Sequence, residues 1–436
     1  MAKAKTLYVC TSCGNESAKW MGKCINCGEW NTYKEIKEPT ISSSNRSVKA
    51  KEITKLSGIK TSTLERIQTG IKELDKALGG GIVNGQVLLL AGEPGIGKST
   101  MLLQIAKNLK DVLYVSGEES LSQIKHRTER LSVKADMSLI AETNIDIVLA
   151  TVKAESAKSD LKAIFIDSVQ TMYTESISSA PGSVGQVREV SLQLIRFAKK
   201  SGIPVILVGH VTKGGNVAGP ATLMHMVDTV CWFEGESKAD LRLVRIMKNR
   251  FGPTDEIGLF VMSSKGLVSM EDIDEYLLKK DRLTNVAGTV TSCVMEGSRT
   301  ILVEVQALAI PTKLAIPRRV VQGIDSKRAE LLIAVLTKHC KVKLYEFDVY
   351  INIVGGVKVR DTSLDLAVCA AVNSSVKDKP IKPNTAVIGE VGLLGDIRMP
   401  LKYKKYCNHL KKHGFSTIGP DDTQICSSLQ KTLTSK

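Results

Sequence analysis

The sequence GEPGIGKS at residues 92–99 is the most informative stretch of the chain for its fold. It matches the pattern G-x-x-x-x-G-K-S, in which the backbone N–H groups of a glycine-rich loop surround the phosphates of a nucleotide. The apolar run QVLLLA precedes this loop, and the run TMLLQIAKNL, which has helical periodicity, follows it. A glycine-rich turn without a ligand is the alternative, but strand, loop and helix stand in the order that phosphate binding requires.

The residues of this loop have separate expected roles in binding ATP and Mg²⁺. Lys98 is expected to reach the β and γ phosphates, the Ser99 hydroxyl is expected to ligate Mg²⁺, and the helix N-terminus adds partial positive charge. The expected cofactor-binding residues are Gly92, Glu93, Pro94, Gly95, Ile96, Gly97, Lys98, Ser99 and Thr100.

Acidic residues follow two other apolar runs of the same region. Asp167 ends the run AIFID and is expected to hold Mg²⁺ and its water shell. Glu118 and Glu119 follow the run LYVSG, where a carboxylate can activate the attacking water. We prefer Glu118 as the catalytic residue. The alternative is that both glutamates stabilise a helix N-terminus as first-turn acids.

Apolar runs alternate with amphipathic ones from Gly70 onward, which predicts an α/β domain whose parallel sheet is covered by helices on both faces. The runs at 229–236, 241–249 and 257–264 follow one another with short turns. They predict antiparallel strands added to that sheet, and the domain is expected to end near Met270.

The C-terminal third predicts a second domain of α+β type. The run GTVTSCVMEGSRTILVEVQAL indicates a hairpin that turns at Glu296-Gly297-Ser298. The further elements expected are a helix over 326–339, a strand over 347–356, a helix over 363–376, strands around 385–397 and a basic helix over 402–413.

Four of the ten cysteines form two closely spaced pairs. Cys10-x₂-Cys13 and Cys24-x₂-Cys27 are separated by ten residues, and this spacing predicts one tetrahedral, structural Zn²⁺. Redox-active thiols are the alternative, but a shared metal explains two such pairs better.

The chain of 436 residues carries 60 Lys and Arg against 45 Asp and Glu, a formal net charge of +15. This excess favours a polyanionic partner such as nucleic acid, with an anionic membrane surface or a merely lysine-rich surface as alternatives. No run reaches the roughly 18 apolar residues of a membrane span, and the basic start lacks the apolar stretch of a secretory signal. We therefore expect a cytoplasmic protein without a membrane partner.

His210 follows the apolar run IPVILVG, and Lys213 lies in the loop that comes next. The carboxyl ends of parallel strands face the ligand in α/β proteins. His210 and Lys213 are therefore candidates for sensing the γ-phosphate or for belonging to a DNA-contacting loop.

Five motifs in one order resemble a known family. They are CTSCG...WMGKCINCGEWN, GEPGIGKST, YVSGEES, GHVTKGGNVAGP...MHMVDTV..FEGE and KNRFGP. They resemble the bacterial RadA (Sms) family of DNA repair proteins over nearly the whole chain. The resemblance implies a RecA-like ATPase, a homo-hexameric ring and a DNA-dependent ATPase activity. It also implies work with the RecA recombinase, in which the protein promotes branch migration on single-stranded or branched DNA.

The pentapeptide KNRFG is a signature of that family, placed near the nucleotide and the subunit interface. Its residues here are Lys248, Asn249, Arg250, Phe251 and Gly252. The resemblance implies that Lys248 or Arg250 acts catalytically on the γ-phosphate bound by a neighbouring subunit. An exposed turn shaped by Asn249 and Gly252 is the alternative.

The C-terminal domain resembles the proteolytic domain of Lon, whose active site is a Ser-Lys pair. Ser363 stands near the serine position and Lys404 approximates the lysine. The glycines and proline of the Lon serine turn are absent, and Ser363 reads equally well as a helix-start residue. We expect a proteolytically inactive scaffold for oligomerisation and DNA contact. The lysines expected to contact DNA are Lys402, Lys404, Lys405, Lys411 and Lys412.

Four segments are therefore expected: a four-cysteine zinc finger over 1–35, a linker over 36–62, a RecA-like ATPase domain over 63–270 and a Lon-like domain over 271–436. Three functions compete at this point. They are a DNA-stimulated motor of recombination, an ATP-dependent protease, and a KaiC-like signalling ATPase that DNA does not stimulate.

Overall fold

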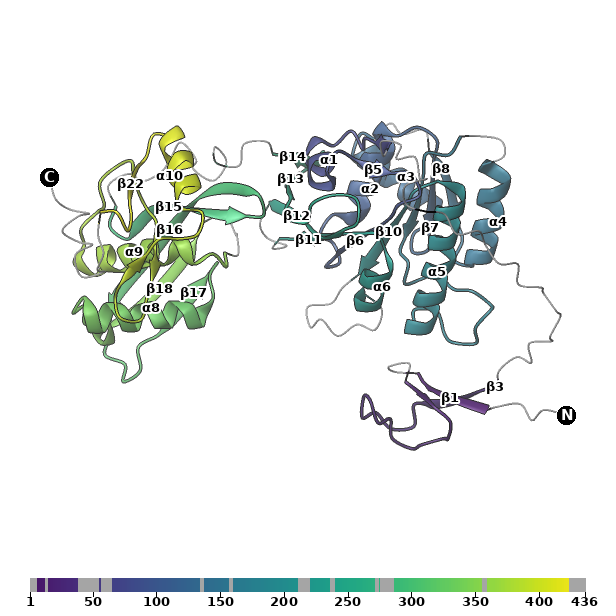
Figure 1. The fold of residues 1–436 in the computed structure, drawn as a ribbon, viewed down its shortest axis with the longest axis horizontal. Coiled ribbons are helices and arrows are strands. Elements are labelled where there is room, and N and C mark those ends of the chain that lie inside the picture. Colours follow the sequence, from purple (N-terminus) through teal and green to yellow (C-terminus); the bar gives the residue numbers. More distant parts are fainter. Residues whose placement is uncertain are drawn as a thin grey trace. The chain divides into compact units, whose positions relative to one another are not determined.

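The computed structural model describes residues 6–11, 15–37, 55, 65–133, 137–156, 160–210, 220–235, 240–270, 274, 286–354 and 359–422. The chain divides into two compact units, which Figure 1 shows as ribbons. The first unit comprises 1–234, 244–254 and 262–268, and the second comprises 235–243, 255–261 and 269–436. The domain boundaries expected at residues 35, 62 and 270 stay predictions.

A nine-stranded sheet has the strand order β14-β13-β12-β11-β6-β10-β9-β7-β8. Neighbours from β6 to β8 in this order pair in parallel, as the alternation of apolar and amphipathic runs predicts. The strands are β6 (Val87–Gly92), β7 (Val112–Ser116), β8 (Ser138–Ala141), β9 (Ala163–Asp167), β10 (Val205–His210), β11 (Thr229–Glu234), β12 (Leu241–Asn249), β13 (Ile257–Ser263) and β14 (Gly266–Ser269).

The prediction that the run at 229–236 adds an antiparallel strand is wrong. Strand β11 pairs in parallel with β6, in the register Thr229 to Leu88 through Trp232 to Ala91. The physical reason is a helix that the sequence pattern did not reveal. Helix α6 (Pro220–Met226) lies between β10 and β11, and such a crossover returns the chain in the same direction.

Helices cover both faces of this sheet in the first unit (Figure 1). Val87, Leu89 and Ala91 of β6 belong to a core that includes residues of α4, α5 and α6. The alternate residues Leu88 and Leu90 are also buried, as expected for a parallel sheet covered twice. The remaining elements of this region are α1 (Lys72–Leu78), α2 (Lys98–Asn108), α3 (Leu121–Arg130), α4 (Ile145–Ser156), α5 (Val184–Ser201) and the short strands β4 (Arg66–Ile67) and β5 (Ile82–Val83).

The N-terminal segment forms a small sheet of three strands in the order β2-β1-β3. Strand β1 (Thr6–Cys10) pairs antiparallel with β2 (Glu16–Ser17) and with β3 (Tyr33–Lys37). Cys10, Cys24 and Tyr33 are buried together, so a thiol-rich cluster takes the place of a larger apolar core. Most of the predicted linker lies outside the described residues.

The second unit contains a six-stranded sheet with the order β17-β18-β16-β15-β19-β22. The predicted hairpin is confirmed, since Glu296 pairs with Arg299 across its turn. Helices α8 and α9 belong to the core on one face of this sheet, and α10 belongs to a second cluster with Cys293 and Leu302. The elements are β15 (Thr289–Glu296), β16 (Arg299–Pro311), β17 (Arg319–Gln322), α8 (Ser326–His339), β18 (Phe347–Ile353), α9 (Asp365–Lys377), β19 (Thr385–Val387), α10 (Tyr403–Lys412) and β22 (Ser416–Ile418). A separate pair is formed by β20 (Glu390–Val391) and β21 (Ile397–Arg398).

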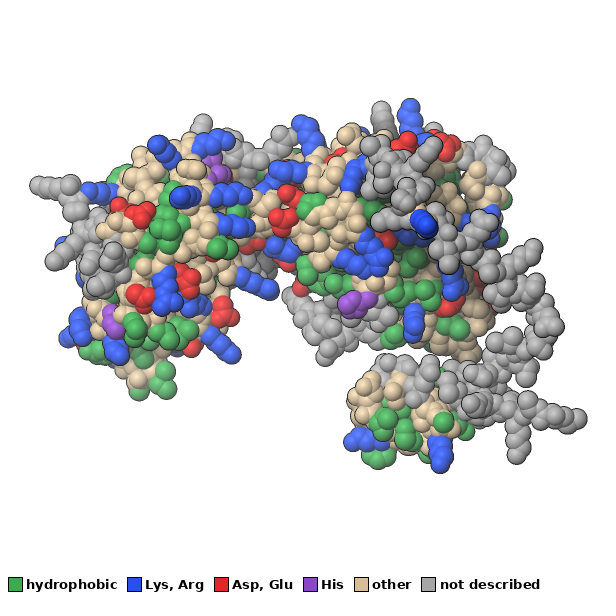
Figure 2. All heavy atoms as spheres, viewed as in Figure 1, with side chains coloured by type: hydrophobic (Ala, Val, Ile, Leu, Met, Phe, Trp, Pro, Cys, Tyr) green, Lys and Arg blue, Asp and Glu red, His purple; other side chains and the backbone are tan. Residues whose placement is uncertain are grey.

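Lys and Arg side chains are scattered over the visible surface of each unit and are interspersed with Asp and Glu (Figure 2). Within the part of the chain that the structure describes, none of the helices combines the length and apolar character needed to cross a membrane.

Candidate active site

The glycine-rich loop lies at the carboxyl end of β6 and leads directly into α2. Gly92, Gly95 and Gly97 have φ of 156°, 75° and 121°, a region that L side chains rarely adopt. A Cβ at Gly97 would lie 2.9 Å from Met262 Cε, whereas one at Gly95 would meet no atom within 4 Å. The loop is therefore packed at its end and open at its middle, where backbone N–H groups can approach phosphates.

Lys98 is the first residue of α2 and is folded onto the loop that precedes it. Its Nζ donates hydrogen bonds to the carbonyl oxygens of Gly92 and Glu93, both at 2.9 Å. Its side chain is 3% exposed. Burial lowers the pKa of Lys98 to about 8, and the charges of Asp167 and Glu118 oppose this shift. Asp167 and Glu118 therefore lie near enough to Lys98 to affect its pKa, although they follow or end other strands of the sheet.

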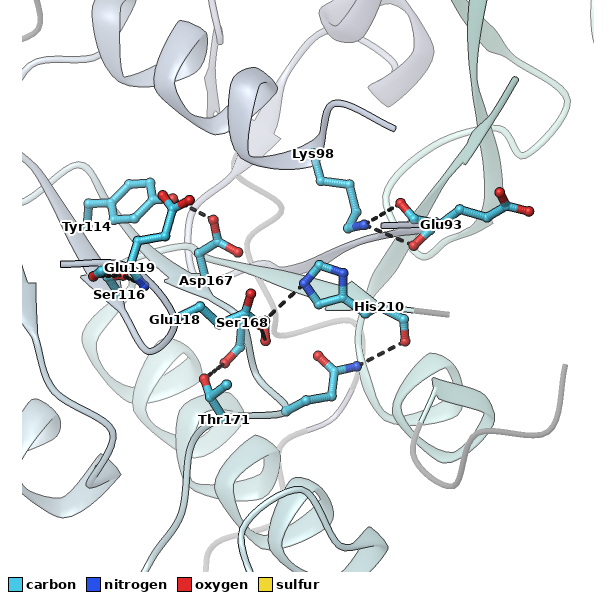
Figure 3. Close-up of polar contacts among 12 residues, drawn as sticks. Glu93, Lys98, Tyr114, Ser116, Glu118, Glu119, Asp167, Ser168, Thr171 and His210 are labelled. Carbon is cyan, nitrogen blue, oxygen red and sulfur yellow. Dashed lines mark hydrogen bonds and ion pairs between the residues drawn. The ribbon is translucent and has the colours of Figure 1, made fainter. Parts of the chain in front are cut away.

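The strand order explains why residues far apart in the sequence meet at this loop. Strands β6, β10, β9 and β7 are consecutive neighbours in the sheet, and His210 of β10 is in register with Gly92 of β6. Ser116 of β7 is in register with Asp167 of β9. The carboxyl ends of these strands therefore form one edge, and Figure 3 shows Lys98, Asp167 and His210 pointing toward a common space.

Asp167 ends β9 and is 7% exposed. Tyr114 of β7 donates its hydroxyl hydrogen bond to Asp167 Oδ2 at 2.6 Å. Burial, followed by the charge of Asp167, raises the pKa of the Tyr114 phenol, so this hydroxyl stays a donor. The sequence did not single out Tyr114, because it stands in an apolar run as an ordinary strand residue.

Glu118 and Glu119 are adjacent in the sequence but contact different partners (Figure 3). Glu118 accepts a hydrogen bond from Ser168 Oγ, and its Oε1 lies 3.4 Å from His210 Nε2. Glu119 pairs with Arg127 of α3. Its backbone N–H also donates to Ser116 Oγ at 3.0 Å, which fixes the turn before α3. Glu118 thus lies beside His210, and Glu119 stabilises the start of α3, which is the role that the alternative gave to both glutamates.

His210 contacts Glu118 through its ring and the side-chain amide of Gln170 through its backbone carbonyl. Gln170 Nε2 donates to the His210 carbonyl oxygen at 3.3 Å. Burial lowers the pKa of the His210 imidazole, and the charge of Lys98 lowers it further, while Glu118 and Asp167 oppose the shift. A neutral ring with one donor and one acceptor nitrogen is therefore expected near pH 7. Lys213, the second candidate of this segment, lies outside the described residues.

The pentapeptide KNRFG lies at the amino ends of the parallel strands, and the glycine-rich loop lies at their carboxyl ends. The Arg250 N–H donates to the Asp228 carbonyl oxygen at 3.1 Å, and Asp228 Oδ2 accepts from the N–H of Val87, the first residue of β6. The loop begins at Gly92, the last residue of the same strand. A strand of this length spans roughly 17 Å. Arg250 is exposed, and its backbone contact places it at the amino ends of the parallel strands, whereas its own loop lies at their carboxyl ends.

Besides the backbone contact of Arg250, the other four residues of the pentapeptide also contact neighbouring segments. Lys248 Nζ donates to the carbonyl oxygens of Met224, His225 and Val227, at 3.2, 2.9 and 2.7 Å, and so satisfies the end of α6. Among the other contacts, Asn249 Oδ1 accepts from Thr229 Oγ1, and Phe251 O accepts from Arg66. Lys199 Nζ lies 5.4 Å from the Phe251 ring centroid, and a Cβ at Gly252 would lie 2.9 Å from Asn249 Nδ2.

Three of the four predicted zinc ligands lie together in the N-terminal sheet. Cys10, Cys24 and Cys27 have ligand atoms within 4.8 Å of one another, and the Sγ atoms of Cys10 and Cys27 are 3.7 Å apart. Tetrahedral zinc with Zn–S of about 2.3 Å requires sulfur atoms about 3.8 Å apart, so these thiols fit a zinc ion. Cys13 lies outside the described residues.

The C-terminal residues suggested by the Lon resemblance are not equivalent in exposure. Ser363 is fully buried, and its Oγ donates to the Cys293 carbonyl oxygen at 3.3 Å. Asp361 accepts from the Ser363 N–H, and Asp365 pairs with Arg328. The lysines expected to contact DNA are exposed on or beside α10. They are Lys402, Lys404, Lys405, Lys411 and Lys412.

Two family models match parts of the chain. A model described as KaiC, of the ATPase type, matches residues 67–261, and a model described as rubredoxin metal binding domain matches residues 8–35. Together with the sheets and the cysteine cluster, these matches confirm the predicted α/β fold class. The chain carries a RecA-like ATPase domain and an N-terminal zinc ribbon.

Curated relatives match the chain over almost its full length. The DNA repair protein RadA of Pseudomonas aeruginosa is 46% identical over 423 residues, which cover 95% of this chain and 92% of that protein. The DNA repair protein RadA of Listeria monocytogenes is 45% identical and that of Bacillus subtilis is 42% identical, and each match covers 96% of this chain and 93% of the relative.

Proposed function

Because this chain belongs to the RadA family of DNA repair proteins, we propose that it is a DNA-dependent ATPase of recombinational repair. In this proposal ATP hydrolysis drives movement on single-stranded or branched DNA and promotes branch migration of the joints that the RecA recombinase makes. The observation that carries the proposal is the meeting of Lys98, Glu118, Asp167 and His210 at the carboxyl ends of the parallel strands, where the glycine-rich loop begins.

The residues at the carboxyl ends of these strands have separate proposed roles in binding and hydrolysing ATP. The loop and Lys98 bind the phosphates, and Ser99 and Asp167 hold Mg²⁺, which supplies positive charge to the phosphate oxygens when it is bound. Glu118 is the carboxylate that orients and activates water, since its Oε1 is held by Ser168 beside His210. Glu119 keeps α3 in place through Arg127.

His210 is proposed to couple nucleotide state to the segment that follows it. His210 contacts Glu118 and ends β10, and the chain then passes through residues 211–219 into α6. A neutral imidazole beside the γ-phosphate position can exchange its partner when that phosphate is lost. Lys213 and its neighbours are the part of the chain that we propose to contact DNA.

The pentapeptide is proposed to act on a neighbouring subunit in a homo-hexamer. Arg250 is exposed at the edge away from its own loop, so a phosphate reached by this side chain belongs to another subunit. Lys248 is occupied by three carbonyl oxygens at the end of α6. Between the two cations, these contacts favour Arg250 as the residue that offsets the charge of a neighbour's phosphates and Lys248 as its support.

The C-terminal unit is proposed as a scaffold for oligomerisation and DNA contact rather than as a peptidase. The burial of the Ser363 hydroxyl supports this, because a nucleophile must be open to its substrate. Casein degradation that Ser363→Ala abolishes would instead favour an ATP-dependent protease.

Branch migration of RecA-made joints tests the proposal. With deproteinised three-strand joints as substrate, the wild-type chain with ATP is expected to extend the heteroduplex, and Lys98→Ala is expected to lose that extension. Lys107→Ala is the matched control, because Lys107 is an exposed lysine in the last turn of the same helix. Extension by Lys98→Ala at the wild-type rate would overturn the proposal.

A further inference from the structure

A second group of metal-ligating side chains lies in the C-terminal unit, apart from the zinc ribbon. Asp274, His409 and His413 each offer one ligand atom, and these atoms lie within 4.8 Å of one another. His409 Nε2 is 2.7 Å from Asp274 Oδ2, and His413 Nε2 is 3.4 Å from the same oxygen. Two imidazole nitrogens therefore converge on one carboxylate oxygen.

The helix presents both histidines from a fixed backbone. His409 and His413 are four residues apart at the C-terminal end of α10, a spacing that places two rings on one helix face and that is used for zinc elsewhere. Their ring centroids are 4.8 Å apart. Leu410, between them, is fully buried in the cluster that packs α10 on the sheet.

The carboxylate is held in place on its other side. Asp274 Oδ1 accepts a hydrogen bond from the N–H of Leu302 in β16 at 2.7 Å. The Asp274 side chain is 7% exposed, whereas those of His409 and His413 are 22% and 25% exposed. The anion is thus oriented by a backbone contact of the kind that supports metal ligands, and the histidine side is open to water and to an entering ion.

From this geometry we propose that Asp274, His409 and His413 form a second metal site, for a divalent transition-metal ion such as Zn²⁺. Two imidazoles with one carboxylate suit Zn²⁺, Co²⁺ or Ni²⁺ better than Mg²⁺ or Ca²⁺, which prefer oxygen ligands. Tetrahedral zinc with bonds of about 2.0 to 2.2 Å needs ligand atoms about 3.4 Å apart. The distance from His413 Nε2 to Asp274 Oδ2, 3.4 Å, meets this value. His409 Nε2, at 2.7 Å from the same oxygen, must move outward by about 0.7 Å when an ion binds.

The bound ion would join two segments that are far apart in the sequence. Asp274 belongs to the stretch between β14 and β15, and the histidines end α10. Lys411 and Lys412 are exposed neighbours, and their repulsion of a cation is weakened by the high dielectric constant of water and screened by salt. Three protein ligands leave a position for water, so the site differs from the closed four-thiolate site expected in the ribbon.

Metal content of the full chain tests the site. After treatment with a chelator and equilibration with buffered Zn²⁺ in the absence of nucleotide, the wild-type chain is expected to hold two zinc ions. The double variant His409→Gln and His413→Gln is expected to hold one. Asn408→Ala, an exposed change on the same helix, should hold two. One ion in the wild type, or two in the double histidine variant, would overturn the site.

Cobalt separates the two sites spectroscopically. Co²⁺ in the ribbon should give the intense absorption of sulfur ligands, and a chain with Cys24→Ser and Cys27→Ser should lose that absorption while it still binds one Co²⁺. Should the double histidine variant fail to fold, Asp274→Asn keeps the hydrogen bond from Leu302 and is expected to weaken Co²⁺ binding at the second site at least about 10-fold, since even outer-shell changes cost about 10- to 100-fold. Unchanged affinity in Asp274→Asn would count against the carboxylate as a ligand.

Discussion

The backbone N–H of Arg250 donates a hydrogen bond to the carbonyl oxygen of Asp228 at 3.1 Å. This contact fixes Arg250 at the amino end of the parallel strands, because the Asp228 carboxylate in turn accepts from the first N–H of β6. The phosphate-binding loop lies at the carboxyl end of the same strand. The glycine-rich loop thus lies at the carboxyl ends of the parallel strands, and the exposed cation Arg250 lies at their amino ends. Subunits need this arrangement if each is to act on the nucleotide of the next.

Arg250→Ala is predicted to lower ATP turnover about 10³-fold or more, the effect of losing a finger residue, while leaving ATP binding to a single subunit intact. The decisive measurement mixes Arg250→Ala subunits, which keep a complete loop, with Lys98→Ala subunits, which keep a complete pentapeptide. Neither variant should hydrolyse ATP alone, and the mixture should recover part of the activity. A mixture as inactive as its components would contradict action between subunits.

Lys248→Met serves as the comparison for Arg250→Ala. It removes three hydrogen bonds from an ammonium to carbonyl oxygens and is expected to lower the free energy of unfolding by about 1 to 3 kcal/mol. Arg250→Ala should leave thermal unfolding unchanged, because its side chain is exposed. Equal destabilisation by both changes would mean that Arg250 is structural too.

Glu118→Gln is predicted to lower the rate of hydrolysis about 10²- to 10⁴-fold, the usual contribution of a general base, without weakening ATP binding. Glu119→Gln is the matched control, since its carboxylate pairs with Arg127 rather than facing His210. Single-turnover hydrolysis and nucleotide binding should be measured for both. A larger loss of hydrolysis in Glu119→Gln than in Glu118→Gln would reverse the assignment.

Tyr114→Phe is predicted to raise the Mg²⁺ concentration needed for half-maximal ATP turnover by about 10- to 100-fold, because Asp167 loses the hydroxyl that orients it. At saturating Mg²⁺ the variant should approach the wild-type rate. Tyr173→Phe is the control in the same unit, because Tyr173 is half-buried and its backbone hydrogen bonds, to Thr143 and Ile145, do not involve the hydroxyl that is removed. A fall in rate that saturating Mg²⁺ does not restore would show that Tyr114 acts on something other than the Mg²⁺ ligand.

The pKa of Lys98, lowered to about 8 in the chain without nucleotide, predicts that ATP binding weakens as pH rises from 7 to 9.5. The bound phosphates favour the ammonium form, so above pH 8 binding must take up a proton, and the affinity should fall by up to about 10-fold per pH unit. Lys98→Arg stays charged and should show a flatter profile. A wild-type affinity that is constant across pH 8 would contradict this.

Most of the fold follows from local patterns. The run QVLLLA, the glycine-rich stretch at 92–99 and the periodic run after it predict a strand, a phosphate loop and a helix in that order. The residues Glu296-Gly297-Ser298 likewise predict the turn of the hairpin. Strand β8 has a mixed pattern of exposed and half-buried residues, so it gives no comparable signal. The direction of β11 depended on helix α6, whose seven residues follow a glycine-rich stretch.

That Lys98, Glu118, Asp167 and His210 lie close together was predictable, because each stands at or just after the carboxyl end of a parallel strand. Their roles in catalysis stay predictions. Tyr114 was not predictable, because its role depends on the register of β7 with β9. Ser168 was missed for the same reason, since its contact with Glu118 joins two strands. Asp274 is separated by more than 130 residues from His409 of α10 and from His413, which follows that helix, and only the packing of α10 brings them together.

The measurement that tests the central claim most directly is ATP turnover with and without single-stranded DNA over a series of salt concentrations. A motor that binds the phosphates of DNA should turn over ATP faster with DNA. The logarithm of the DNA concentration for half-maximal stimulation should rise linearly with the logarithm of the salt concentration. A rate that DNA leaves unchanged at every salt concentration would contradict the account and would favour a signalling ATPase instead.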